Sequence, residues 1–121
     1  MMKTSRQEFE ALVADVLEAL PSDFSQRISK VEIVVEPEPP REIKERFPRG
    51  LLLGLYQGTP LTGESTFRPY SMPNRISLYQ RNIERICSNR SQIREQVRKT
   101  LLHEIGHHFG MKEGDLRKAG Y

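Results

Sequence analysis

The stretch that decides the fold is LLHEIGHHFGMKEGD, residues 101–115, which contains all three histidines of the chain. His103, Glu104 and His107 form the pattern H-E-x-x-H. Residues four apart lie on the same face of an α-helix, so both imidazoles can bind one ion. Glu104 lies about 100° round the helix axis, where it can reach a metal-bound water without being a ligand. The pattern therefore predicts a helix with a zinc site and a proton acceptor beside it.

A third ligand is expected from the residues that follow this helix. Gly110 comes three residues after His107 and is suited to end a helix, because glycine adopts positive φ freely. A turn there would bring Glu113 back toward the metal and complete the run H-E-x-x-H-x-x-G-x-x-E. Two histidines and one glutamate form a known catalytic zinc set. Asp115 is the alternative third ligand, although it could instead cap a short helix that follows.

Two other residues of the motif region are expected to pack rather than to bind metal. His108 lies off the face shared by His103 and His107, so we expect a packing role or a contact with a ligand. Met111 lacks the separate downstream turn of a metzincin methionine, so core filling is the better interpretation. A histidine pair alone would be weak evidence. The intervening glutamate, the glycine and the later carboxylate together favour a metal site.

The C-terminal run RKTLLHEIGHHFGMKEGDLRKAGY, residues 98–121, resembles the small bacterial zincin-like metallopeptidases. The resemblance extends to LLLGLYQGTPLT, residues 51–62, and to PNRISLYQRNIERIC, residues 73–87, so its segments lie within residues 51–121, a span of more than half of the chain. It implies a compact minimal zincin fold with a long active-site helix, and zinc peptidase activity. It does not imply a particular substrate.

Matched position by position, the resemblance also implies roles for individual residues. His103 and His107 correspond to metal ligands, Glu104 to the general base and Glu113 to the third ligand. The implied cofactor is Zn²⁺. The motif of this chain does not depart from the family pattern.

The hydrophobic pattern predicts an α+β fold with a small mixed sheet backed by helices. Ser5 and Glu8 form a capping box before an amphipathic helix that Pro21 ends, and Asn89 with Gln92 gives a second capping signal before the long helix. The order of elements is helix, strand, short helix, strand, loop, strand, short helical turn and long helix. Their expected ranges are 5–20, 30–36, 41–47, 51–57, 59–74, 75–80, 82–87 and 89–110.

The segment 51–57, LLLGLYQ, is the most apolar of the expected strands. Its nearly continuous apolar run predicts a central strand that is covered on both faces. Gly54 within it indicates a bulge or a close approach of another segment. The loop 59–74 that follows is long for a compact domain, so we expect it to form part of a cleft wall.

Length and composition predict one cytoplasmic domain over residues 1–121. The only cysteine, Cys87, cannot form an internal disulfide and is expected to be a small buried hydrophobe. Acidic residues interrupt the N-terminal apolar positions, which argues against a signal peptide, and no apolar run is long enough to span a membrane.

The basic residues predict little about partners. The net charge of +3 is too small to indicate nucleic acid as a partner. Six basic residues nevertheless gather between residues 81 and 99, on the approach to the motif, and we interpret them as a solvated helix face, with attraction of an acidic partner as the alternative. These residues are Arg81, Arg85, Arg90, Arg94, Arg98 and Lys99.

Two functions remain open from the sequence. The first is a zinc-dependent peptidase whose peptide or protein substrate lies along a sheet edge, with Glu104 as general base. An oxyanion donor would come from Tyr70, Tyr79 or Tyr121, none of which is favoured. The alternative is a binding module with a structural metal site, whose basic residues meet an acidic partner or nucleic acid. Glu104 argues against the second, because a structural site does not need that carboxylate.

Overall fold

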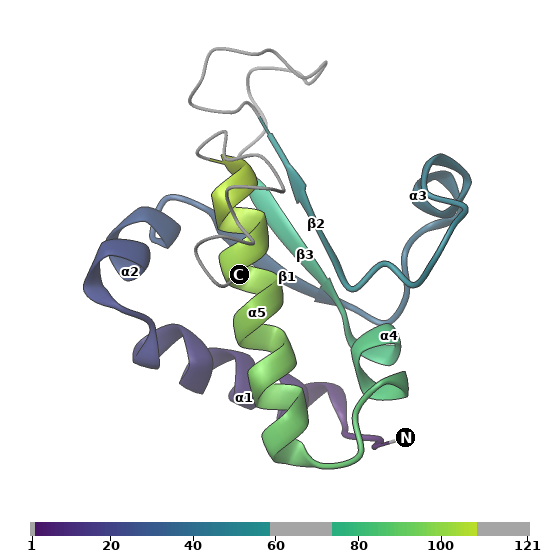
Figure 1. Cartoon of the computed structure of the whole chain (residues 1–121), viewed down its shortest axis with the longest axis horizontal. Coiled ribbons are helices and arrows are strands. Elements are labelled where there is room, and N and C mark those ends of the chain that lie inside the picture. Colours follow the sequence, from purple (N-terminus) through teal and green to yellow (C-terminus); the bar gives the residue numbers. More distant parts are fainter. Residues whose placement is uncertain (1, 59–73, 109–121) are drawn as a thin grey trace.

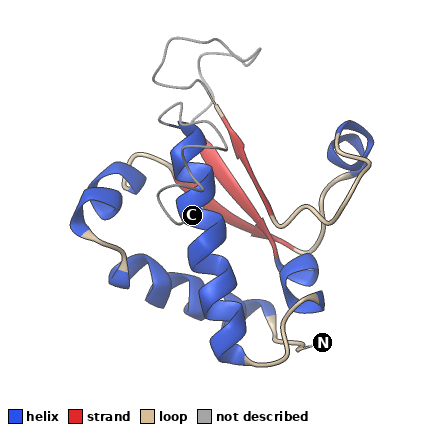
Figure 2. Ribbon diagram, viewed as in Figure 1, coloured by secondary structure: helices blue, strands red, loops and turns tan. Residues whose placement is uncertain are grey.

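The computed structural model of the chain describes residues 2–58 and 74–108. Its elements follow the order α1 (Arg6–Ala19), α2 (Ser22–Ile28), β1 (Glu32–Glu36), α3 (Arg41–Arg46), β2 (Gly54–Gln57), β3 (Arg75–Tyr79), α4 (Gln80–Arg85) and α5 (Arg90–His108). The long helix α5 crosses one face of the sheet, and α1 packs against it (Figure 1). Figure 2 shows the same arrangement by secondary structure. The expected α+β architecture is therefore confirmed.

The three strands form a mixed sheet in the order β1-β3-β2. β1 runs parallel to β3, and β2 runs antiparallel to it. β3 lies in the centre, and its residues from Ile76 to Tyr79 are all at most 2% exposed. One edge of the sheet is therefore β1, which is parallel to the central strand, and the other edge is β2, which is antiparallel to it.

The prediction that residues 51–57 form the central strand was wrong. Only Gly54–Gln57 is strand, it lies at an edge, and Gly54 is the only buried residue among its four. The three leucines before it lie outside the strand and line a pocket beside α5. A continuous apolar run indicates burial, but it does not tell whether a second strand or a helix covers the segment.

The capping signals of the two longest helices are confirmed. Glu8 donates its backbone N–H to the Ser5 hydroxyl, and Ser5 donates its own to the Glu8 carboxylate, so both halves of the box form. Before α5, Gln92 donates its backbone N–H to the Asn89 side chain at 2.8 Å. The helix α2 was not expected, because its sequence SDFSQRI has only two apolar residues and no helical period to detect.

One hydrophobic core joins α1, the sheet and α5. On α5, Ile93, Val97, Leu101 and Ile105 follow one another at four-residue spacing and are buried, with at most 1% exposure for each side chain. They pack with residues of α1 and β3, such as Phe9 and Leu78, in one cluster. Cys87 is also buried, as predicted, and burial raises the pKa of its thiol. This apolar side packs α5 against the sheet, and the motif residues lie on another side of the helix.

A buried carboxylate ties the N-terminal segment to α4. The Glu84 side chain is fully buried and accepts hydrogen bonds from the backbone N–H and the hydroxyl of Thr4, at 2.6 and 2.7 Å. It also accepts from Gln80 and forms an ion pair with Arg81. Burial raises the pKa of Glu84, but the hydrogen bonds from Thr4 and its other donors outweigh it and hold the pKa below its ordinary value.

We predict that Glu84→Gln lowers the free energy of unfolding by about 2 kcal/mol at pH 7, because a charged acceptor is lost where Thr4 donates twice. A group with a lowered folded-state pKa stabilises the fold above its unfolded pKa, and this contribution disappears as the pH falls through the folded-state value. The difference between wild type and variant should therefore shrink below about pH 4. Urea unfolding across pH measures it. Glu10→Gln, on the exposed side of α1, is the control, and an equally stable Glu84→Gln protein would contradict the prediction.

Candidate metal centre

The site begins with how closely α5 approaches β2. A Cβ atom built on Gly54 would lie 2.7 Å from Thr100 Cγ2 and 3.0 Å from the backbone oxygen of Ser77. Both distances are shorter than side chains normally allow, so only glycine fits between the helix and the neighbouring strand. Of the two roles expected for Gly54, the close approach is therefore the correct one. It places the turn of α5 that carries the motif directly beside the sheet edge.

The two motif histidines converge. His103 Nε2 and His107 Nε2 lie 3.2 Å apart, and the ring planes make an angle of 74° with their centroids 4.8 Å apart. With zinc–nitrogen bonds of about 2.0–2.1 Å, two nitrogen ligands of a tetrahedral ion stand about 3.3 Å apart. Each imidazole is half-buried, so both can be reached by an ion. The pair therefore has the spacing of two ligands of one zinc ion.

Glu104 is held on the other side of the same turn, against the sheet. Its Oε1 accepts a hydrogen bond of 2.8 Å from the backbone N–H of Tyr56 in β2. Glu104 and the two histidines still form one group, in which the possible ligand atoms all lie within 4.8 Å of one another. The carboxylate is thus fixed next to the imidazoles and points toward β2.

The register of the sheet shows which side of β2 carries this contact. Tyr79 donates its backbone N–H to the Leu53 oxygen, and in an antiparallel pair the bonded positions then alternate along the strand. Leu55 and Gln57 accordingly bond to β3. Gly54 and Tyr56 direct their N–H and C=O groups to the outer edge of the sheet. The Tyr56–Glu104 hydrogen bond therefore joins the motif to the outer edge of β2.

Several residues that the sequence nominated lie outside the described part of the chain. The third-ligand candidates Glu113 and Asp115 are among them, as are Tyr70 and Tyr121. Gly110, Phe109, Met111 and most of the expected loop 59–74 fall there too. The predicted roles of these residues stay predictions.

Tyr79 is the one oxyanion candidate that the structure describes. Only 1% of it is exposed, and alternation along β3 puts it on the opposite face from Leu78, which packs in the core with α5. Burial, with the nearby Glu36 carboxylate second, raises the pKa of Tyr79 to about 12. The phenol therefore keeps its proton at neutral pH, and the Glu104 carboxylate is among the charges that raise its pKa.

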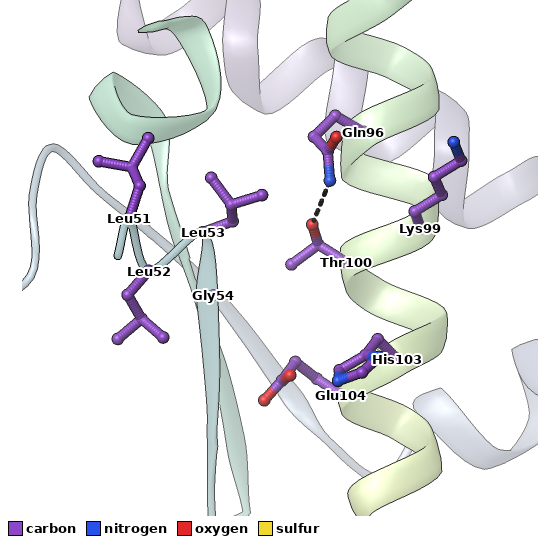
Figure 3. A pocket seen from close by; sticks show the side chains of 9 residues that line it. All are labelled: Leu51, Leu52, Leu53, Gly54, Gln96, Lys99, Thr100, His103 and Glu104. Carbon is purple, nitrogen blue, oxygen red and sulfur yellow. Dashed lines mark hydrogen bonds between the residues drawn. The ribbon is translucent and has the colours of Figure 1, made fainter. Parts of the chain in front are cut away.

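A pocket of about 390 Å³ adjoins the motif on the N-terminal side of His103. Figure 3 shows Leu53 reaching toward α5, where Gln96 donates from its side-chain amide to the Thr100 hydroxyl at 3.3 Å. The remaining lining residues are Leu51, Leu52, Gly54, Lys99, His103 and Glu104. This pocket was not predicted, although the three leucines before Gly54 were the signal that could have revealed it.

The five arginines between residues 81 and 98 are paired with carboxylates within the chain. Each of the five forms an ion pair with a carboxylate, and the pairs are Arg81–Glu84, Arg85–Glu38, Arg90–Glu8, Arg94–Asp15 and Arg98–Glu95. Lys99 is the exception, since the described residues bring no carboxylate within 4.0 Å of its ammonium group. The interpretation as a solvated helix face agrees with these pairs, which leave little uncompensated charge for an acidic partner.

Comparison with known proteins identifies the family. A model of the zincin-like metallopeptidase family matches residues 28–121. The chain belongs to this family. The resemblance seen in the sequence is thereby confirmed, and the family implies a metal ion, usually zinc, for which His103, Glu104 and His107 could supply ligand atoms.

Solved structures add the fold of this zincin-like protein. It is similar to a conserved hypothetical protein from Thermo thermophilus, with a TM-score of 0.58 and 24% sequence identity. The alignment covers 96% of this chain and 98% of that one, so the likeness extends over the whole fold. No curated protein matches the sequence. Among the described residues, no helix has the length and apolar character needed to cross a membrane.

We predict that Gly54→Ala lowers the free energy of unfolding by about 1–3 kcal/mol, because the added methyl group meets Thr100 and Ser77. Urea unfolding measures the loss. Thr100→Ser removes the Cγ2 atom and keeps the hydroxyl that Gln96 contacts, so the double variant should recover part of the stability. A Gly54→Ala protein as stable as wild type would show that α5 does not approach β2 this closely.

Zinc binding should depend on both converging imidazoles. We expect about one zinc per chain after dialysis, and most of it should be lost from His103→Ala and from His107→Ala. Elemental mass spectrometry on dialysed protein measures the ratio. His108→Ala is the control, because its position in the motif is off the ligand face. Loss of zinc from His108→Ala alone would contradict the assignment.

Proposed function

We propose that this protein is a zinc-dependent peptidase that hydrolyses peptide bonds with Glu104 as the general base. The observation that carries the proposal is the 3.2 Å separation of the His103 and His107 Nε2 atoms, with the Glu104 carboxylate held beside them. Membership of the zincin-like metallopeptidase family supports the same reaction class.

His103 and His107 would hold the metal, and a carboxylate from the C-terminal segment would complete the set. Glu113 has the spacing of the third ligand, and Asp115 is its alternative. Two imidazoles and one carboxylate match the donor preference of zinc. When bound in such a set, zinc acts as a Lewis acid and lowers the pKa of a water molecule toward about 7.

Glu104 would serve as proton acceptor because the strand holds it away from the ligand role. Its hydrogen bond to the Tyr56 N–H fixes the carboxylate beside the imidazoles, where it would act on a metal-bound water. The carboxylate would take a proton from the attacking water and pass it to the leaving amine. A structural metal site would not need a carboxylate fixed in this position.

The outer edge of β2 would bind the substrate. Edge strands offer backbone N–H and C=O groups that an extended peptide can pair with by β-augmentation. The N–H and C=O groups of Gly54 face this edge, and Glu104 takes the Tyr56 N–H beside them, so the peptide would pair with Gly54. A peptide or protein segment lying there would pass directly over the motif face of α5. Sequence preference would then come from the side-chain pockets along this edge.

A cytoplasmic location is part of the proposal. The single cysteine is buried and its thiol pKa is raised, so the chain carries a reduced thiol of low reactivity. This supports a reducing compartment without defining it.

We predict that Glu104→Gln keeps its zinc and loses turnover by about 10²- to 10⁴-fold, because only the proton acceptor is removed. The assay is mass-spectrometric detection of cleavage in a peptide mixture, with zinc content measured in the same sample. Glu95→Gln is the matched control, since Glu95 lies on the exposed side of α5 and pairs with Arg98. Cleavage by Glu104→Gln at the wild-type rate would remove Glu104 from the mechanism, and no cleavage by zinc-loaded wild type would remove the peptidase.

A further inference from the structure

The pocket beside the motif has walls of two different kinds. On one side Leu53 presents an aliphatic side chain, and on the opposite side Lys99 leaves α5 away from the leucines (Figure 3). Gln96 and Thr100, joined by their hydrogen bond, lie between them on the helix. The volume of about 390 Å³ is in the range of small ligand sites, and it suits one or two amino-acid residues. The pocket therefore has an apolar wall on the side of β2, and Lys99 is the one cationic side chain among the residues that line it.

The direction of a bound peptide decides which of its residues would enter this pocket. α5 and β2 run the same way, because Gly54 lies against Thr100 and Tyr56 lies against Glu104. An added strand is slightly more stable when it is antiparallel to its neighbour. Such a peptide would run from the His107 end toward the Thr100 end. The residues on the carboxyl side of the scissile bond would then reach the pocket.

Lys99 differs from the basic residues around it. The five arginines before the motif all pair with carboxylates of the chain, whereas the described residues offer no such partner to Lys99. Lys99 precedes His103 by one helical turn, which is a rise of about 6 Å. An extended peptide covers that distance in about two residues. An exposed ammonium group at this place is suited to a carboxylate on the substrate.

We propose that this pocket selects peptides with an aliphatic residue directly after the scissile bond and a carboxylate about one residue later. The aliphatic side chain packs on Leu53, and Lys99 pairs with the carboxylate. The carboxylate is either the C-terminus of a peptide cut near its end or the side chain of an aspartate or glutamate. The assignment rests on the proposed peptidase function, because that function sets the position of the scissile bond.

Paired peptide mixtures test the proposal. Each sequence is made with a free C-terminal carboxylate and with a C-terminal amide, and a third set carries the amide together with an internal aspartate. Zinc-loaded wild type should cut the carboxylate-bearing peptides about fivefold faster than the amides, and high salt should reduce the ratio. Preference for the free acid alone identifies a C-terminal carboxylate, and equal preference for internal aspartate identifies an acidic side chain.

Substitutions assign the preference to Lys99. Lys99→Gln should bring the ratio to about one, and Lys99→Arg should keep the ratio. Arg98→Gln is the matched control, since it removes a neighbouring cation that already pairs with Glu95. Equal cleavage of acid and amide by wild type, or an unchanged ratio in Lys99→Gln, would overturn the proposal.

Binding separates this proposal from the peptidase itself. Zinc-loaded Glu104→Gln protein is titrated with the same peptides, and amide NMR shifts of Leu53 and Thr100 report occupation of the pocket. Tighter binding of the free acid that depends on Lys99 would support the pocket assignment even if no peptide were cut. Cleavage without acid-selective binding would overturn the pocket assignment and leave the peptidase in place.

Discussion

The contact of α5 with Gly54 is the constraint on which the rest of the site depends. Because position 54 has no side chain, Thr100 lies against the strand, and the next turn of the helix brings Glu104 to the Tyr56 N–H. A larger residue there would separate helix and strand, and the carboxylate would lose its anchor. The anchored position of Glu104 at the sheet edge and the neighbouring pocket therefore both depend on this close approach.

One side of the helix α5 packs in the core and another carries the metal motif. The sequence predicts some of these roles but not all of them. Its core side could be predicted, because apolar residues recur every four positions from Ile93 to Ile105 and all of them are buried. Its metal side could be predicted as well, because H-E-x-x-H fixes the relation of three side chains within one element. The third ligand depends on the chain after Gly110, which lies outside the described residues.

Other features could not be read from the sequence because they depend on contacts between distant segments. The apolar run 51–57 predicted burial on both faces, yet Leu51 is 43% exposed, Gly54 alone in the run is buried, and β3 is the one strand that pairs with it. The helix α2 lacks an apolar period, and the ion pairs of the arginines require carboxylates as far away as Glu8 and Glu38. Lys99 became distinct only once those pairs were known. Contacts between distant segments thus determine the features that the local sequence pattern does not predict.

The central claim is that His103 and His107 bind one zinc ion together, and X-ray absorption at the zinc edge of the loaded protein tests it most directly. The spectrum distinguishes imidazole from oxygen and sulfur ligands and reports how many rings are bound. We expect two imidazoles with zinc–nitrogen distances of about 2.0–2.1 Å, completed by oxygen ligands. A spectrum with a single imidazole, or with a zinc–sulfur distance of about 2.3 Å, would contradict it.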